Sequence, residues 1–317
     1  MRFPDKGNML DMVKGSVATL ALFLAYVMLP LVGMFPGFFT PLPAMFYTLK
    51  RGRITGAAIV AVTLVVLAVL ADSATTLLYF LQCGVISLTL PVFLERGKPG
   101  GKSIAYAVAI NLGVILLLAV LYGAVQGVNM HTRVVKEIQS SISQTATLYE
   151  KAGIKGEDLT SLKQGMAEAG ALIGQVYPAL VVVCLAVIAG LNLLVLRRVS
   201  ARLPVPLALG DFRTFKNPEQ LVWVLIVAGF TMLVPDRQVK IAALNVLVVT
   251  VSLYFIQGMA IIAHFFTRFA VPRFMRVVFY VVLALQPYLV VAVAALGIFD
   301  IWGDFRTPRP PKQQENL

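Results

Sequence analysis

Cysteine and histidine are scarce in this sequence, with two residues of each among 317. Cys83 and Cys184 both lie inside apolar runs, and His131 and His264 are far apart in the chain. Zinc and related metals are held by clusters of such side chains at short spacing. The sequence therefore predicts no metal site, and its two isolated cysteines indicate neither an oxidising nor a reducing compartment.

Short catalytic motifs are absent as well. The chain contains no GxxxxGKS/T phosphate loop, no HExxH zinc motif, no CxxC pair, no GxSxG nucleophile turn and no GxGxxG dinucleotide fingerprint. Each of these motifs places backbone amides or reactive side chains around a phosphate, a metal or a scissile bond. We therefore expect a protein that is not an enzyme, with no catalytic residues and no cofactor.

Charged residues make up only 13% of the chain, whereas hydrophobic residues make up 59% and the mean hydropathy is +0.84. A soluble domain has about 25% charged and about 45–50% apolar residues. The hydrocarbon core of a bilayer is about 30 Å thick, and a helix of roughly 20 apolar residues crosses it. Several runs reach that length, so the sequence predicts an integral membrane protein. The first run is too long for a cleaved signal peptide, and we expect it to be retained.

The apolar runs predict nine membrane-spanning helices, the second of them short. Their approximate ranges are 15–35, 37–49, 54–71, 75–94, 103–128, 171–196, 220–235, 240–264 and 277–299. The short run 37–49 contains Pro41 and Pro43 and could be tilted or re-entrant, so eight spans are the alternative count. The predicted fold is an all-α, polytopic transmembrane bundle.

The net charge of +12 comes from Lys and Arg clusters that lie between the apolar runs. Such clusters favour the cytoplasmic side of a membrane, whereas a nucleic-acid-binding surface shows a basic stripe with interleaved aromatic residues. Most of the 27 Lys and Arg residues fall in segments that face the side of the N-terminus when nine spans alternate. We therefore predict a multi-pass protein of the bacterial cytoplasmic (inner) membrane, with a cytoplasmic N-terminus, an extracytoplasmic C-terminus and no nucleic-acid partner.

The segment 129–170 is the one long polar stretch between predicted spans. Apolar residues recur at helical spacing on both sides of a glycine-containing turn at 151–157, which predicts an extracytoplasmic helical hairpin. The hairpin is either a stalk or a docking site for a partner. The chain thus divides into an N-terminal membrane bundle (1–128), the hairpin (129–170), a C-terminal membrane bundle (171–299) and a polar, proline-rich tail (300–317). We expect the part of the tail after Trp302 to be disordered.

Neutral amides, and almost no charges, occupy the interiors of the predicted spans. These amides are Gln82, Asn111, Asn192, Asn245, Gln257 and Gln286. Pumps and proton-coupled carriers usually keep ionisable groups at that depth, so ion coupling by this chain alone is not expected. An amide in hydrocarbon needs a partner, and it either pins two helices together or lines a cavity in which a ligand supplies the partner. Pinning is the commoner use.

Gln257 followed by Gly258 is the first candidate ligand site, because a glycine beside an amide permits close approach of a ligand. Asn245 lies on the same predicted helix but 12 residues away, about 18 Å along the axis, so the two amides would not hold one small ligand at a single depth. Asn111 and Gln82 are further candidates.

Small residues at four-residue spacing let membrane helices approach closely. The pairs Gly123 with Gly127 and Gly170 with Gly174 flank the predicted hairpin, and we interpret them as helix-packing positions. Ala21 and Ala25 form a similar pair in the first predicted span. This pair either packs inside the bundle or docks a partner protein in the membrane.

With these features the chain resembles the YybS-like family, bacterial polytopic membrane proteins whose domain is of unknown function. The residues that carry the resemblance are the Pro41-Leu42-Pro43 break, the Lys50-Arg51-Gly52-Arg53 turn, the 129–170 hairpin, the Asn217-Pro218-Glu219-Gln220 helix start, and Asn245 with Gln257-Gly258. Proteins of this kind look distantly similar to the substrate-binding subunits of energy-coupling-factor transporters. That likeness implies a subunit that binds a vitamin or a metal and docks through Ala21 and Ala25 onto a partner that hydrolyses ATP.

Two functions lead at this point, and an integral-membrane enzyme, whose chemistry would have to come from Asp, Arg or His at the span ends, comes third. The first is a permease-like or small-molecule-binding membrane subunit, energised by a separate partner because the chain has no nucleotide motif. The alternative is a membrane scaffold or assembly factor that acts through protein–protein contacts, made by the hairpin or by the loop at 197–219. The expected partners are the lipid bilayer, a small molecule, and an energising or scaffolded membrane protein.

Overall fold

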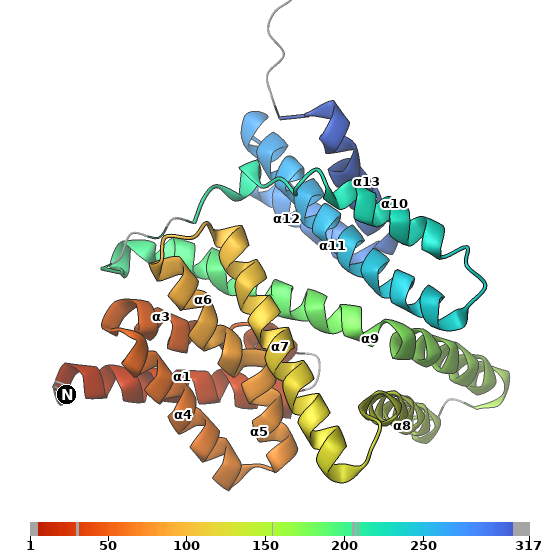
Figure 1. The fold of residues 1–317 in the computed structure, drawn as a ribbon, viewed down its shortest axis with the longest axis horizontal. Coiled ribbons are helices and arrows are strands. Elements are labelled where there is room, and N and C mark those ends of the chain that lie inside the picture. Colours follow the sequence, from red (N-terminus) through yellow and green to blue (C-terminus); the bar gives the residue numbers. More distant parts are fainter. Residues whose placement is uncertain (1–5, 30–31, 154, 205–206, 208, 307–317) are drawn as a thin grey trace, which may run out of the picture. The chain divides into compact units, whose positions relative to one another are not determined.

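The computed structural model describes residues 6–29, 32–153, 155–204, 207 and 209–306 (Figure 1). Within these ranges the chain forms helices joined by turns, and no strand is present. Six helices are long and apolar enough to cross a membrane. The prediction of an all-α, multi-pass membrane protein is therefore confirmed.

The six candidate spans have the following bounds. They are α1 (Lys6–Met28), α4 (Arg53–Leu70), the continuous run of α5 (Ser73–Tyr79), η1 (Phe80–Gly84) and α6 (Val85–Glu95), then α7 (Gly100–Gln126), α9 (Gly156–Val199) and α11 (Arg237–Arg268). A seventh span is added if α12 (Arg273–Leu285) and α13 (Pro287–Gly303), which meet at 109°, are counted as one. The described residues therefore provide six or seven candidate spans, where the sequence predicted nine.

Prolines break two of the predicted spans. The run 37–49 is divided between α2 (Met34–Gly37) and α3 (Leu42–Arg51), with Pro41 at the junction. The run 277–299 is divided at Pro287, because a proline disfavours helical geometry in the residue before it. Gln286 accordingly has φ −116° and ψ 96°.

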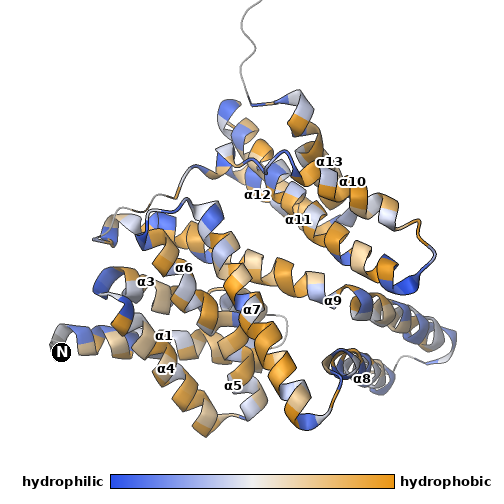
Figure 2. Ribbon diagram, viewed as in Figure 1, coloured by the Kyte–Doolittle hydropathy of each residue, from blue (hydrophilic) through white to orange (hydrophobic). Residues whose placement is uncertain are grey.

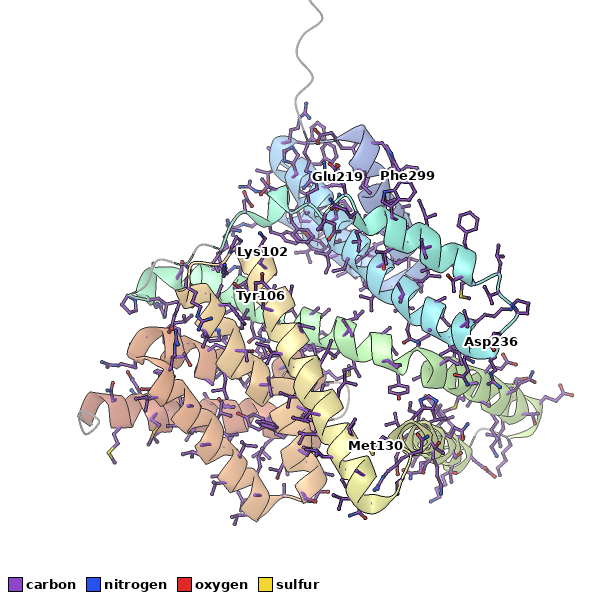
Figure 3. The ribbon with its side chains drawn as sticks, viewed as in Figure 1. Lys102, Tyr106, Met130, Glu219, Asp236 and Phe299 are labelled. Atoms are coloured by element: carbon purple, nitrogen blue, oxygen red, sulfur yellow. The ribbon has the colours of Figure 1, made fainter. Side chains whose placement is uncertain are left out.

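The predicted span 220–235 is too short to cross a bilayer as an α-helix. Its helix, α10, covers Leu221–Thr231, which is 11 residues or about 16 Å. The chain then turns through 232–235 to Asp236, whose carboxylate accepts hydrogen bonds from the first amides of α11. Figure 3 shows Asp236 at this turn.

The chain divides into two compact units. Unit 1 comprises Met1–Gly174 and Val181–Gly210, and unit 2 comprises Gln175–Leu180 and Asp211–Leu317. This division differs from the segments predicted from the sequence, because the hairpin and most of α9 belong to unit 1. Of the predicted tail 300–317, Asp300–Gly303 belong to α13, while residues 307–317 lie outside the described part of the chain.

Two apolar clusters hold unit 1 together. One joins α3, α6, α7 and α9, and the other joins α1, α4 and α5. Ion pairs tie the helix ends at one end of the unit: Asp11 accepts from Lys50 and Arg51 at 3.3 and 2.7 Å, and Glu95 accepts from Arg53 at 2.8 Å. The chain turns between α3 and α4 at Gly52, whose φ of +103° favours glycine. Each of these pairs lies at a helix end and leaves the helix interiors apolar.

The predicted hairpin consists of α8 (Met130–Lys151) and the first part of α9. Ile142 packs against Gly170, and Val135 packs against Gly174. Lys163 and Glu150 form an exposed ion pair at 2.9 Å. Figure 2 shows more hydrophilic residues along α8 than along α7 or α11. The two helices are therefore present, while their position outside the bilayer stays a prediction.

Unit 2 is built on a close crossing of α11 and α13. A Cβ added to Gly258 would overlap the carbonyl oxygen of Val293, and a Cβ added to Gly297 would overlap the carbonyl oxygen of Tyr254. The two helices run antiparallel, because the earlier residue of one helix faces the later residue of the other. Two 3-10 turns follow α9 and precede α10 along the chain. They are η2 (Ser200–Arg202) in unit 1 and η3 (Phe212–Thr214) in unit 2.

The crossing predicts opposite effects for two glycine-to-alanine changes in unit 2. Gly258→Ala should lower the unfolding midpoint of the purified protein, because overpacking costs about 1–3 kcal/mol. Gly229→Ala, on α10 with open space around it, should be neutral or slightly stabilising. Thermal unfolding in detergent measures both, and equal midpoints for the two variants would contradict the close crossing.

Candidate functional site

Gln257 is fully buried, and both polar atoms of its side chain have partners in unit 2. Its Oε1 accepts a hydrogen bond from the Asn217 backbone N–H at 2.9 Å, and its Nε2 donates to Asp300 Oδ2 at 2.9 Å. The Asn217 side chain also donates to the Leu253 carbonyl at 2.9 Å. Gln257 therefore links α11 to the start of α10 and to α13, and neighbouring Gly258 faces α13 across the close crossing.

Asp300 is fully buried, although the sequence analysis assigned it to the polar tail. Its Oδ1 accepts from the Phe305 backbone N–H at 3.2 Å, and its Oδ2 accepts from Gln257 and from Arg306. The other terminal nitrogen of Arg306 donates to the carbonyl oxygens of Arg213 and Phe215. This ion pair lies at the end of α13 and just beyond the predicted span 277–299, so the span interiors stay nearly free of charge.

Asn245 is bound to α9 at the turn around Pro178, which lies inside this continuous helix. Proline has no N–H and its ring crowds the preceding turn, so the helical hydrogen bonds are disturbed there. The Ala179 N–H donates to Asn245 Oδ1 at 2.9 Å, and Asn245 Nδ2 donates to the Gln175 carbonyl at 2.7 Å. In an unbroken helix Ala179 would donate directly to Gln175. The Asn245 carboxamide thus bridges Ala179 and Gln175 in place of the direct hydrogen bond between them.

Asn111 in unit 1 differs from Gln257 and Asn245 in that its side chain has no hydrogen-bond partners among the described residues. Its side chain is fully buried, yet neither its Oδ1 nor its Nδ2 has a hydrogen-bond partner among the described residues. Gln82 Oε1 is buried without a partner in the same part of the chain. The Asn192 side chain is satisfied at one of its two polar atoms. Its Nδ2 donates to the carbonyls of Phe38 and Ile188 at 2.7 Å each, while its Oδ1 has no described partner.

Asn111 and Gln82 lie at similar depth in unit 1. The turn at residues 96–99 joins α6 to α7, and equal rise on both sides of it brings Asn111 level with about residue 84. The π-helix η1, which contains Gln82, contacts α7. Next to Gln82, the buried Cys83 lies close to Thr40 and to Cys184 of α9. We call Asn111, Gln82, Thr40 and these two cysteines the amide site.

Unpartnered amides carry more information than unpartnered hydroxyls. A hydroxyl such as that of Ser16 or Thr19 can rotate, and in a helix it can donate to the carbonyl of the preceding turn. A carboxamide offers two donors and one acceptor atom in a fixed plane, and burying it without partners costs about 2–7 kcal/mol. Two amides with buried, unpartnered atoms, one of them in a π-helix, a feature frequent at functional sites, identify the amide site as the candidate binding site.

The remaining predicted positions are spread over unit 1. Gly123 lies near the Val128 carbonyl, and Gly127 ends α7 in a left-handed conformation at φ +64°. Ala21 is exposed and Ala25 is half-buried on α1. The described residues contain no group of three or more His, Cys, Asp or Glu side chains that could hold a metal.

Comparison with known proteins places the chain among membrane proteins. Residues 17–301 match the family described as predicted membrane protein (DUF2232). The chain is also 24% identical over 291 residues to the uncharacterized protein YybS of Bacillus subtilis (strain 168), a stretch that covers 90% of this chain and 92% of that protein. No solved structure matches it. The resemblance to YybS-like proteins is confirmed, and the likeness to energy-coupling-factor subunits stays a prediction.

The geometry at Pro178 predicts that two substitutions are not additive. Asn245→Leu should destabilise the protein by about 1–3 kcal/mol for each backbone group left without a partner. Pro178→Ala allows Ala179 to donate to Gln175 directly, so the same Asn245→Leu change should cost less in that background. Unfolding midpoints of the two single variants and the double variant test this. An equal cost of Asn245→Leu in both backgrounds would show that the carboxamide does not replace the helical bond.

The ion pair of Asp300 with Arg306 predicts the outcome of a second double-mutant cycle. Arg306→Gln should cost about 3–5 kcal/mol, because it leaves a buried carboxylate without its counter-charge. Adding Asp300→Asn should recover part of that loss. The exposed pair of Lys163 and Glu150 provides the control, and Lys163→Gln should change stability by less than about 1 kcal/mol. If the double variant were less stable than Arg306→Gln alone, the pair would not be the source of the cost.

Proposed function

The chain belongs to the DUF2232 family of predicted membrane proteins, and from the surroundings of its buried amides we propose that it is a small-molecule-binding membrane subunit. The binding site is the amide site of unit 1, with Asn111 and Gln82 as the polar groups that contact the ligand. Gln257 and Asn245 hold unit 2 together. The subunit is permease-like, and a separate partner supplies the energy.

The observation that carries this proposal is the pair of unpartnered atoms on Asn111. Asn245 and Gln257 have partners for both ends of their carboxamides, so this chain satisfies amides where they serve packing. At Asn111 a leucine of similar size would fill the same space without the desolvation cost. An amide that lowers stability persists where function requires it, and a bound ligand would supply the missing hydrogen bonds.

An energising partner is supported by the exposed face of α1. Met9, Val13 and Val17 follow one another at four-residue spacing and are more than half exposed, and Ala21 continues this ridge. Residues four apart lie on one face of a helix, and small residues on such a face allow another helix to approach. The ridge is therefore the proposed docking face for a membrane partner.

The second candidate function, a scaffold, is supported by a groove on the hairpin. The groove has a volume of about 500 Å³ and lies along α8, which begins at Met130 (Figure 3). Its apolar lining includes Met130, Val134, Ile138 and Ile173. An amphipathic helix of another protein recognises such a groove through residues at helical spacing.

One substitution made at two asparagines tests the proposed function. Asn111→Leu should raise the unfolding midpoint of the ligand-free protein, because it removes an unsatisfied amide, whereas Asn245→Leu should lower it. Any small molecule that stabilises the wild type should fail to stabilise Asn111→Leu. Thermal unfolding of detergent-purified protein measures both effects. If Asn111→Leu were as destabilising as Asn245→Leu, Asn111 would be a packing residue and the proposal would fail.

A further inference from the structure

We infer that the amide site takes a small, neutral, planar molecule that presents a hydrogen-bond donor beside an acceptor, as on the edge of a lactam, a ureide or a pyrimidine. This inference rests on the proposed function and specifies the ligand of that same site. It follows from two properties of the site, the pattern of its unpaired atoms and the distance to the nearest charges.

The unpaired atoms of Asn111 require both a donor and an acceptor from the ligand. Its Oδ1 and Nδ2 are both buried and both without a described partner. A carboxamide pairs in a bidentate manner with a planar edge that carries a donor next to an acceptor, as asparagine does with the edge of adenine. A ligand with only acceptors, or only donors, would leave one Asn111 atom unpaired.

Gln82 adds a requirement for a second donor. Its buried Oε1 accepts nothing from the described residues, and only a donor can satisfy it. Asn111 and Gln82 come from adjoining elements, α7 and η1, that contact each other. A molecule with a donor–acceptor edge for Asn111 and a further N–H or O–H for Gln82 satisfies both amides.

The site disfavours a charged ligand because the three elements that carry it hold no charged residue close to the site residues along the chain. On α7 the nearest charged residue to Asn111 is Lys102, nine residues or roughly 14 Å along the axis (Figure 3). On the chain through η1, the nearest to Gln82 is Asp72, ten residues away. On α9, the nearest to Cys184 is Arg197, 13 residues away. A charge buried without a counter-ion or full hydrogen bonding is strongly disfavoured, so the ligand is neutral.

Several charged residues at the ends of the surrounding helices are paired with one another. Asp11 is paired with Lys50 and Arg51, and Glu95 is paired with Arg53. At the other end of α4 and α5, hydrogen bonds from Thr75 hold the pKa of Asp72 below its usual range and keep that carboxylate at the start of α5. These groups stabilise helix ends and are held away from the amide site.

A matched set of pyrimidines tests the ligand class. The probes are uracil, 1,3-dimethyluracil, which lacks both N–H donors, and orotate, which adds a carboxylate to the uracil ring. Uracil at millimolar concentration should raise the unfolding midpoint of the full-length wild type, and the other two should not. The shift by uracil should be lost in Asn111→Leu, reduced in Gln82→Leu and retained in Asn245→Leu when each is compared with its own ligand-free midpoint.

The possible failures are distinguishable from failure of the proposed function. Equal stabilisation by uracil and 1,3-dimethyluracil, or stronger stabilisation by orotate, would overturn the assigned ligand class. No shift with any of the three would overturn it too, while the opposite effects of Asn111→Leu and Asn245→Leu on the ligand-free protein would still support a binding site. A charged or purely apolar compound that stabilises the wild type but not Asn111→Leu would disprove the class and support the function.

Discussion

A polar group in apolar surroundings must find a hydrogen-bond partner, and the arrangement of both units depends on how this requirement is met. In unit 2 the requirement produces structure: Asn245 completes the helix beside Pro178, and Gln257 joins three segments around Asp300. In unit 1 neither polar atom of the Asn111 side chain has a partner among the described residues. The same residue type is therefore satisfied in one unit and unsatisfied in the other, and the proposed function rests on this difference.

Much of the fold could be predicted from the sequence, because apolar runs and their lengths are local properties. The helical content, the multi-pass class and the two helices on either side of 151–157 all follow from such runs. The nine predicted spans exceed the six or seven candidate spans of the described residues because run length does not reveal a break: Pro287 lies inside an apolar run, yet the helices on either side of it meet at 109°. The short α10 likewise occupies a run that continues as turns after Thr231.

The buried ion pair could not be predicted, because its contacts connect distant parts of the chain. Arg306 binds carbonyl groups 91 and 93 residues earlier, and Asp300 binds Gln257, 43 residues earlier. The proline-rich stretch that follows Arg306 made this region resemble a tail. The amides were located correctly as polar positions within apolar helices, but sequence alone cannot tell Asn111 from Asn245. Whether an amide has a partner depends on the neighbouring helices, and only the structure supplies them.

The π-helix η1 has a mechanical consequence for the amide site. A π-helix bonds each amide to the carbonyl five residues earlier, so it accommodates one residue more than an α-helix of the same length. If η1 tightened to α-helical bonding, the residues on one side of it would advance by one position and rotate by about 100° around the axis. Gln82 lies in the middle of this segment, which contacts α7, and such a change of register would turn its side chain to another face of the helix while α6 and its apolar contacts stayed in place. A single extra residue would thus suffice to alternate the site between an assembled and a dispersed state.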